Sequence, residues 1–362
     1  MGPQHPSTHG VLRVLLRTDG EIVTEAHPHI GYLHRCAEKI GECLDYVKFQ
    51  PYTDRMDYLA AMNNNLGYAM VVESLAGLEI PERATLLRII IVELNRIASH
   101  LIAFGTYGLD SGAMTPFFHA WREREEMLTL FEKICGARLT YNYVCIGGVV
   151  NDAPEGWKDK VLDFLDRFEK RWTEYNNLLS YNRIFIRRSA NIGVITPEEC
   201  YDYGLTGPML RGSGISWDLR RDRPYLGYDR FDFDVPVGQG EMGTLGDCWD
   251  RYWVRMVEMK ESAKIVRQAF DLLETAEGSH KAKVPKVFKP KVGEAYVGIE
   301  NPRGELGFYV LSDGSKNAYR LRVRGPSFCN LSILEKLLPG TMIADAVMVI
   351  GSTDIVLGEV DR

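Results

Sequence analysis

The pattern of hydrophobic and polar positions predicts strands at both ends of the chain. Apolar and polar residues alternate from Val11 to Arg17 and again from Glu21 to Glu25, with a turn signal at Asp19-Gly20 between them. This pattern is typical of a β-hairpin. Near the other end we predict a second, small β-sheet, because three strand-like stretches follow one another: Glu294 to Glu300, Glu305 to Ser312 and Ala318 to Val323.

Between these strands, apolar residues recur at helical spacing over most of the chain. The stretch from Arg83 to Phe104 is apolar on most faces, which indicates a buried helix. Its strongly polar interior positions are Arg88, Glu93, Asn95, Arg96 and His100. Because strands and helices do not alternate, the order predicts an α+β chain with a large helical body. The predicted helices cover residues 30–47, 58–75, 83–104, 127–134, 157–179, 250–273, 331–338 and 342–350.

We expect three parts along the chain. Residues 1–30 form an N-terminal loop and hairpin, residues 31–292 a helical body, and residues 293–362 a C-terminal α+β segment. Within the body, residues 203–245 are rich in Gly, Pro, Tyr, Asp and Arg and show little periodicity. Irregular regions of that length are usually functional or bound to a partner, so we expect extensive contacts with other proteins.

Composition narrows the class of protein. A formal net charge of -6 argues against a general nucleic-acid binder, because there is no surplus of Lys and Arg for phosphates. The seven cysteines contain no Cys-x-x-Cys pair, which disfavours a zinc ribbon or an iron–sulfur cluster held by this chain alone. The longest apolar candidate, Met342 to Gly358, is interrupted by Asp345 and Asp354. We therefore expect a soluble or peripheral protein.

The first candidate for chemistry is the loop GPQHPSTHG, from Gly2 to Gly10. Its prolines and glycines predict a shaped loop, and a histidine there, such as His5 or His9, can exchange a proton near neutral pH. A solvated histidine without a role is the alternative. A metal site formed by His27, His29 and His34 is disfavoured, since no i,i+4 pair lies on a single helix.

The other candidates are likewise ambiguous from their local sequence. Asp110, in the stretch GLDSG after a buried helix, could be a helix-capping or turn residue, or a partner for a histidine. Tyr58 opens a predicted helix. It could pack its ring and bond a backbone group, or it could present its hydroxyl to a ligand.

Motifs along essentially the whole chain resolve part of this ambiguity. They are GPQHPSTHGVLR, GYLHR, RMDYL, ELNRIASHL, TPFF with REREE, RGELGFYVLSDG, RVRGPSF and the terminal GEVDR. In this order they resemble the family of the quinone-site subunit of respiratory complex I. This is the D-type subunit of the bacterial proton-translocating NADH:quinone oxidoreductase, called the forty-nine-kilodalton subunit in mitochondria.

The resemblance implies a fold like that of the large subunit of [NiFe] hydrogenases, to which the family is similar by descent. Those enzymes hold their metal with a Cys-x-x-Cys pair near each end of the chain. Here the corresponding regions read LHRCAEK and STDIVLGEV, with one cysteine and none respectively. Because a nickel site needs thiolates, hydrogenase activity is excluded.

The resemblance also implies a set of site residues. The ligands of the quinone headgroup fall on His9 and Tyr58, and Asp110 matches the position that hydrogen-bonds the histidine. Arg35 and Arg55 match positions beside a [4Fe–4S] cluster that the neighbouring B-type subunit holds. A phenol and an imidazole suit this task, because each oxygen of a reduced quinone takes a hydrogen bond and then a proton.

One position departs from the family pattern. Many members have a histidine where this chain has Thr140, and that histidine is associated with a pH-dependent cluster potential. Threonine does not titrate in this range. We therefore expect the potential of the cluster to vary little with pH.

The resemblance finally implies a role inside an assembly. We expect a peripheral subunit on the cytoplasmic face of a bacterial plasma membrane, or the matrix side of the inner membrane in mitochondria. Its expected partners are the B-type and C-type subunits, the membrane H-type subunit and quinone, with no cofactor bound by this chain alone. Two alternatives stay open: a related complex that uses ferredoxin or a reduced deazaflavin, and a non-catalytic scaffold.

Overall fold

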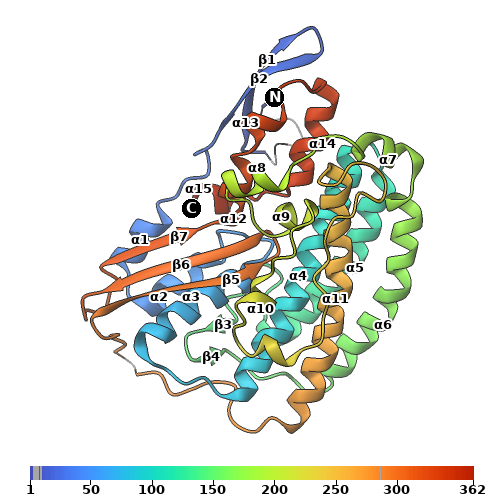
Figure 1. The fold of residues 1–362 in the computed structure, drawn as a ribbon. Helices are drawn as coiled ribbons and strands as arrows, with labels where there is room; N and C mark the ends of the chain where they lie inside the picture. The colour runs from blue at the N-terminus through green and yellow to red at the C-terminus, as the bar shows by residue number, and fades with distance from the viewer. Residues whose placement is uncertain (3–7, 9, 286) are drawn as a thin grey trace.

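Helices α4 (Glu82–Asp110) and α11 (Cys248–Thr275) lie side by side at the centre of the molecule. The computed structural model describes residues 1–2, 8, 10–285 and 287–362. Helices α5 (Met114–Cys135) and α6 (Trp157–Tyr175) flank this pair (Figure 1). Helix α4 is buried along most of its length, as its apolar composition predicts.

The predicted C-terminal sheet is confirmed. Strands β5 (Gly293–Asn301), β6 (Gly304–Ser312) and β7 (Arg320–Arg324) form an antiparallel sheet in that order. The sheet packs on α3 (Ala61–Ala76), where a Cβ atom at Gly67 would lie 2.9 Å from the ring of Phe308. Together with the helices these strands confirm the α+β class.

The predicted N-terminal hairpin is also confirmed, but it is longer than expected. Strands β1 (Arg13–Asp19) and β2 (Ile22–His29) pair antiparallel, and Figure 1 shows the hairpin at one edge of the molecule. The second strand does not end at Glu25, where the predicted alternation stops, but continues through residues 27–29. Pro28 pairs with Val14 in a two-stranded ribbon, where a residue without an N–H is tolerated on the free edge.

The single helix predicted over residues 30–47 is wrong. Two helices, α1 (Ala37–Cys43) and α2 (Tyr46–Thr53), meet at Asp45, whose carboxylate accepts the backbone N–H of Lys48. This is an N-terminal cap. Asp45 thus begins a new helix where the apolar spacing alone suggested a continuous one.

The C-terminal end of the chain is helical and buried, although we predicted no helix beyond residue 350. Helix α14 (Ile343–Thr353) is followed by Asp354 in the left-handed region (φ 48°) and by α15 (Leu357–Asp361). The remaining elements are β3 (Val144–Cys145), β4 (Gly148–Val149), a π-helical turn (Asn176–Ser180), α7 (Arg183–Ser189), α8 (Pro197–Asp202), α9 (Pro208–Gly212), α10 (Leu219–Asp222), a 3-10 turn (Tyr228–Arg230), α12 (Pro326–Leu331) and α13 (Leu334–Leu337).

The irregular region at residues 203–245 lies against the body of the same chain. It contains α9 and α10, and its side chains Arg211, Asp218 and Arg220 are almost fully buried. Contacts of this region with other proteins stay a prediction. In the described part of the chain, no helix is both long enough and apolar enough to cross a membrane.

Candidate functional site

Tyr58 lies in a rigid turn just before α3, and not on the first turn of the helix as we predicted. The carboxylate of the preceding residue, Asp57, accepts the backbone N–H groups of Leu59 and Ala60, each at 3.2 Å. From α4, Asn95 donates to the carbonyl of Leu59 and accepts the N–H of Met62, both at 3.1 Å. These bonds hold the backbone on both sides of Tyr58.

The side chain of Tyr58 is half-buried and its hydroxyl is available as a donor. The hydroxyl makes no hydrogen bond with the described residues, which contradicts the alternative of a tyrosine bonded to the backbone. Burial raises the pKa of Tyr58, and the neighbouring Asp57 raises it further, against the opposing charges of Arg303 and Arg35. Tyr58 therefore keeps its proton at neutral pH.

The C-terminal helix α15 borders this turn closely. A Cβ atom at Gly358 would lie 2.5 Å from the carbonyl oxygen of Met56 and 3.4 Å from Cε1 of Tyr58. Only glycine leaves room for this approach. The terminal motif GEVDR thus forms one wall beside the tyrosine.

The structure brings Arg35 and Arg55 together with Tyr58. The guanidinium of Arg35 donates to the backbone carbonyl of Arg55, and that of Arg55 donates to the carbonyl of Pro51. Both side chains are exposed, and Arg35 is close enough for its charge to act on Tyr58. The two arginines therefore present positive charge to the surface beside the tyrosine.

Asp110 is the last residue of α4. It borders the C-terminal segment of the chain, as Tyr58 does, but at a different helix. A Cβ atom at Gly351 of α14 would be 3.0 Å from its Oδ2 atom, whereas Gly358 borders Tyr58. The carboxyl group is half-buried and makes neither a hydrogen bond nor an ion pair with the described residues. A capping role is thus contradicted, and no hydrogen bond among the described residues joins Asp110 to Tyr58. Burial raises the pKa of Asp110 to about 7.

His9, the second predicted headgroup ligand, lies outside the described residues, as does His5. Among the residues that the structure does describe, no group of three or more His, Cys, Asp or Glu side chains could hold a metal ion. A surface pocket of about 640 Å³ lies between α2 and residues 281–288. It contains neither Tyr58 nor Asp110, so we assign it no part in this site.

Sequence analysis missed a buried cluster that supports Tyr58, which we call the Arg303 cluster: Asp57, Ser99, Arg255, Arg303 and Asp354. Arg303 donates to Asp57 (2.8 Å), to the hydroxyl of Ser99 (3.0 Å) and to Oδ1 of Asp354 (3.2 Å). Arg255 lies 3.5 Å from Oδ2 of Asp354. The only signal in the sequence was that Arg303 and Asp354 lie within the stretches RGELGFYVLSDG and STDIVLGEV.

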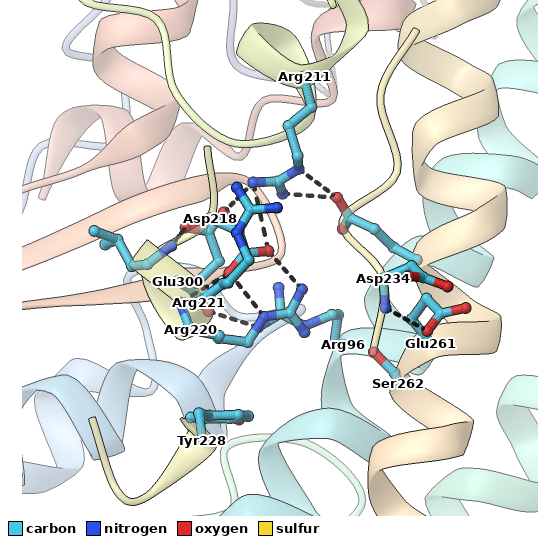
Figure 2. Close-up of polar contacts among 12 residues, drawn as sticks. Arg96, Arg211, Asp218, Arg220, Arg221, Tyr228, Asp234, Glu261, Ser262 and Glu300 are labelled. Atoms are coloured by element: carbon cyan, nitrogen blue, oxygen red, sulfur yellow. Dashed lines mark hydrogen bonds and ion pairs between the residues drawn. The ribbon is translucent and has the colours of Figure 1, made fainter. Parts of the chain in front are cut away.

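A second buried cluster, the core network, crosses the helical body (Figure 2). Its ionisable members come from α4, the irregular region, α11 and β5, and are Glu93, Arg96, Arg211, Asp218, Arg220, Glu258 and Glu300. Arg211 binds Glu258 at 2.7 Å and Glu300 at 2.8 Å. Burial alone would raise the pKa of Glu93, but Arg96 and Arg220 lower it to about 2. Each of these buried charges lies beside a group of opposite charge, as buried charges in proteins usually do.

Thr140 is half-buried in a loop beside Asp54, with a left-handed backbone (φ 52°) that is uncommon for a β-branched residue. Asp54 is buried next to Arg55 (3.7 Å) and accepts the backbone N–H of Asn142. Burial raises the pKa of Asp54 to about 6. Asp54, a titratable group that sequence analysis missed, therefore lies beside Arg55. The weak dependence of the cluster potential on pH, which we expect from Thr140, stays a prediction.

The raised pKa of Asp110 predicts a pH-dependent cost in stability. The folded pKa of about 7 exceeds the usual value of 3.8, so the folded state binds more protons between these values and stability falls as pH rises towards 7. Asp110→Asn removes the charge at almost constant volume. We expect it to raise the midpoint of thermal unfolding at pH 8, with a smaller effect at pH 5.5.

Thermal unfolding of the purified protein at both pH values checks this prediction. Asp163→Asn, at an exposed position on α6, is the matched control and should leave the midpoint unchanged within error. A lower midpoint for Asp110→Asn at pH 8 would show that the carboxylate is stabilising.

Comparisons with known proteins identify the family of this chain. The profile of the family described as "Respiratory-chain NADH dehydrogenase, 49 Kd subunit" matches residues 110–292 and 279–362. The chain is 56% identical over 361 residues to one of the D-type subunits of NADH-quinone oxidoreductase, numbered 2, from Anaeromyxobacter dehalogenans (strain 2CP-C). The match covers 100% of this chain and 95% of the relative.

Two further relatives show the same coverage of this chain. The D-type subunit of NADH-quinone oxidoreductase from Bacillus anthracis is 54% identical over 361 residues, covering 100% of this chain and 97% of the relative. The protein of the same name from Chlorobium luteolum (strain DSM 273 / BCRC 81028 / 2530) is 52% identical over 364 residues, covering 100% and 92%. The chain therefore belongs to the family of the 49 kDa subunit of respiratory-chain NADH dehydrogenase.

Proposed function

We propose that this chain is the D-type subunit of a multisubunit NADH:quinone oxidoreductase and that it forms the site where quinone is reduced. The family membership and the names of the relatives support this role. The observation that carries the site assignment is the hydroxyl of Tyr58. It is protonated, has no partner among the described residues, and lies beside two exposed arginines.

The chemistry follows from the properties of these groups. As quinone takes up two electrons, its carbonyl oxygens become basic, and each accepts a hydrogen bond and then a proton. The raised pKa of Tyr58 keeps its proton in place until charge develops on the oxygen it bonds. We assign the second donor to His9. Asp110, with a pKa of about 7, holds a proton that it can exchange with the histidine near neutral pH.

The electrons come from outside this chain in our proposal. The B-type subunit would hold a [4Fe–4S] cluster beside Arg35 and Arg55, whose positive charge would raise the potential of the cluster. A Gly-x-Gly-x-x-Gly match, from Gly238 to Gly243, lies in the irregular region, where it neither follows a strand nor opens a helix. It therefore lacks the context of a dinucleotide-binding fingerprint, and we assign NADH oxidation to other subunits. We further propose contacts with the C-type and membrane H-type subunits, coupling to proton translocation, and a peripheral position on the cytoplasmic face of the membrane.

Purification through an affinity tag on this chain tests the proposal. We expect a membrane-associated complex that contains iron–sulfur subunits and reduces quinone with NADH as the donor. Reduction of quinone by ferredoxin but not by NADH would instead identify a related complex. An intact complex that transfers electrons from NADH to an artificial acceptor but never to quinone would favour the scaffold alternative.

A further inference from the structure

A small cavity, lined mostly by buried residues, lies where α4, α11 and the end of α14 meet. Its volume of about 10 Å³ is close to the space that one water molecule needs. His100 of α4, Arg255 of α11 and Asp354 after α14 are among the residues that line it. It therefore lies between the core network, which His100 contacts through Glu258, and the Arg303 cluster, to which the other two residues belong.

Three buried polar atoms around this cavity have no hydrogen-bond partner among the described residues. They are Nδ1 of His100, Nε of Arg255 and Oδ2 of Asp354. The three residues are 0%, 5% and 6% exposed, so bulk water does not supply a partner. The nearest pairing is 3.5 Å between Arg255 Nε and Asp354 Oδ2, an ion pair that does not satisfy hydrogen-bond geometry. Buried polar atoms in folded proteins are almost always hydrogen-bonded.

The hydrogen-bonding capacity of the three atoms matches one water molecule. The Glu258 carboxylate, paired with Arg211, accepts a hydrogen bond from Nε2 of His100 at 2.8 Å. Burial lowers the pKa of His100, so the ring is neutral and its Nδ1 is an acceptor. Oδ2 of Asp354 is a second acceptor and the N–H of Arg255 is a donor. A water molecule donates two hydrogen bonds and accepts others, and so satisfies all three.

We propose that this cavity binds one water molecule, which donates to His100 Nδ1 and Asp354 Oδ2 and accepts from Arg255 Nε. The water joins the two buried clusters into one chain, from Glu258 through His100 and the water to Asp354. From there Arg303 connects the chain to Asp57, the residue next to Tyr58. His100 is thus a positioning residue for the turn that carries Tyr58.

A map of the wild-type complex at a resolution that shows ordered water tests the site directly. We expect a peak about 2.6–3.2 Å from each of the three atoms. Ordered side chains around a cavity without a peak would overturn the proposal. So would a direct hydrogen bond between His100 and Asp354. This measurement does not depend on the function of the complex.

Two substitutions of His100 test the positioning role, which rests on the proposed function. In His100→Gln the side-chain amide can still donate to Glu258, but no acceptor remains at the Nδ1 position. In His100→Asn an amide oxygen replaces Nδ1 and the bond to Glu258 is lost. We expect His100→Gln to lower kcat for quinone reduction on the order of 10-fold with little change in KM, because small misplacements of a reacting group are costly. His100→Asn should keep most of the wild-type kcat, because its amide oxygen still accepts a hydrogen bond from the water.

Electron transfer from NADH to an artificial acceptor should be unchanged in both variants. A loss of kcat confined to His100→Asn would show that His100 acts only through its bond to Glu258. Equal losses in the two variants would show that the acceptor at Nδ1 has no special part. Either result would overturn the positioning role. If neither variant assembles, the map of the wild type still decides the water site. A failure of the proposed function has a different signature: normal quinone reduction in Tyr58→Phe, with the water peak in place.

Discussion

Tyr58→Phe is expected to reduce quinone reduction roughly 100-fold or more, the usual scale for loss of a positioned proton donor. The substitution keeps the ring and removes only the hydroxyl. Because this hydroxyl bonds none of the described residues, the fold loses no hydrogen bond to them. The complex should therefore assemble with its clusters intact, and electron transfer from NADH to an artificial acceptor upstream should be unchanged. Both activities are measured in the same membranes.

Tyr309→Phe is the matched control, since it removes a tyrosine hydroxyl that bonds Glu294 on the sheet. It should leave quinone reduction near normal. His9→Ala should be less harmful than Tyr58→Phe if water can replace the imidazole. Near-normal quinone reduction in Tyr58→Phe would mean that the headgroup site is assigned wrongly.

Arg303→Met is expected to have the largest effect on stability. The guanidinium is 1% exposed and bonds Asp57, Ser99 and both the carbonyl and the carboxylate of Asp354. Its removal leaves two buried carboxylates without their main counter-charge. Breaking a buried pair in this way typically costs about 3–5 kcal/mol, which is a large fraction of the stability of a domain. We expect little assembled complex, and a lowered unfolding midpoint in what remains.

The amount of assembled complex in membranes and its thermal unfolding measure this effect. Arg322→Met is the control, because Arg322 forms an exposed ion pair with Glu38 that should contribute at most about 1 kcal/mol. Adding Asp57→Asn and Asp354→Asn to Arg303→Met should recover part of the loss, since the buried charges are then gone. No recovery would mean that packing of the arginine side chain, and not charge, is responsible.

The local pattern of apolar and polar residues was sufficient to predict most of the long helices and strands. The hairpin, the three C-terminal strands and helices α3, α4, α6 and α11 follow from apolar spacing and turn residues, because each buries one face or nearly all of its surface. The pattern did not predict the boundary of an element where a single side chain determines it. Pro28 continues β2 because it lies in a two-stranded ribbon, and Asp45 divides a helical stretch by capping α2. Neither effect changes the apolar spacing.

The sequence by itself determined the family and the candidate site residues, because the motifs that contain Tyr58, Arg35 and Arg55, and the stretch around Asp110, can be read without a structure. Only the tertiary structure decided what surrounds them. Asp57 and its partner Arg303 are 246 positions apart. Glu93, Arg96 and His100 of α4 bond residues in the irregular region, in α11 and in β5. Coulomb interactions and desolvation depend on distance in space, and separation along a chain does not encode it. Two further properties likewise depend on the packing of α14 and α15 against the site. One is the Tyr58 hydroxyl, which bonds none of the described residues, and the other is the raised pKa of Asp110.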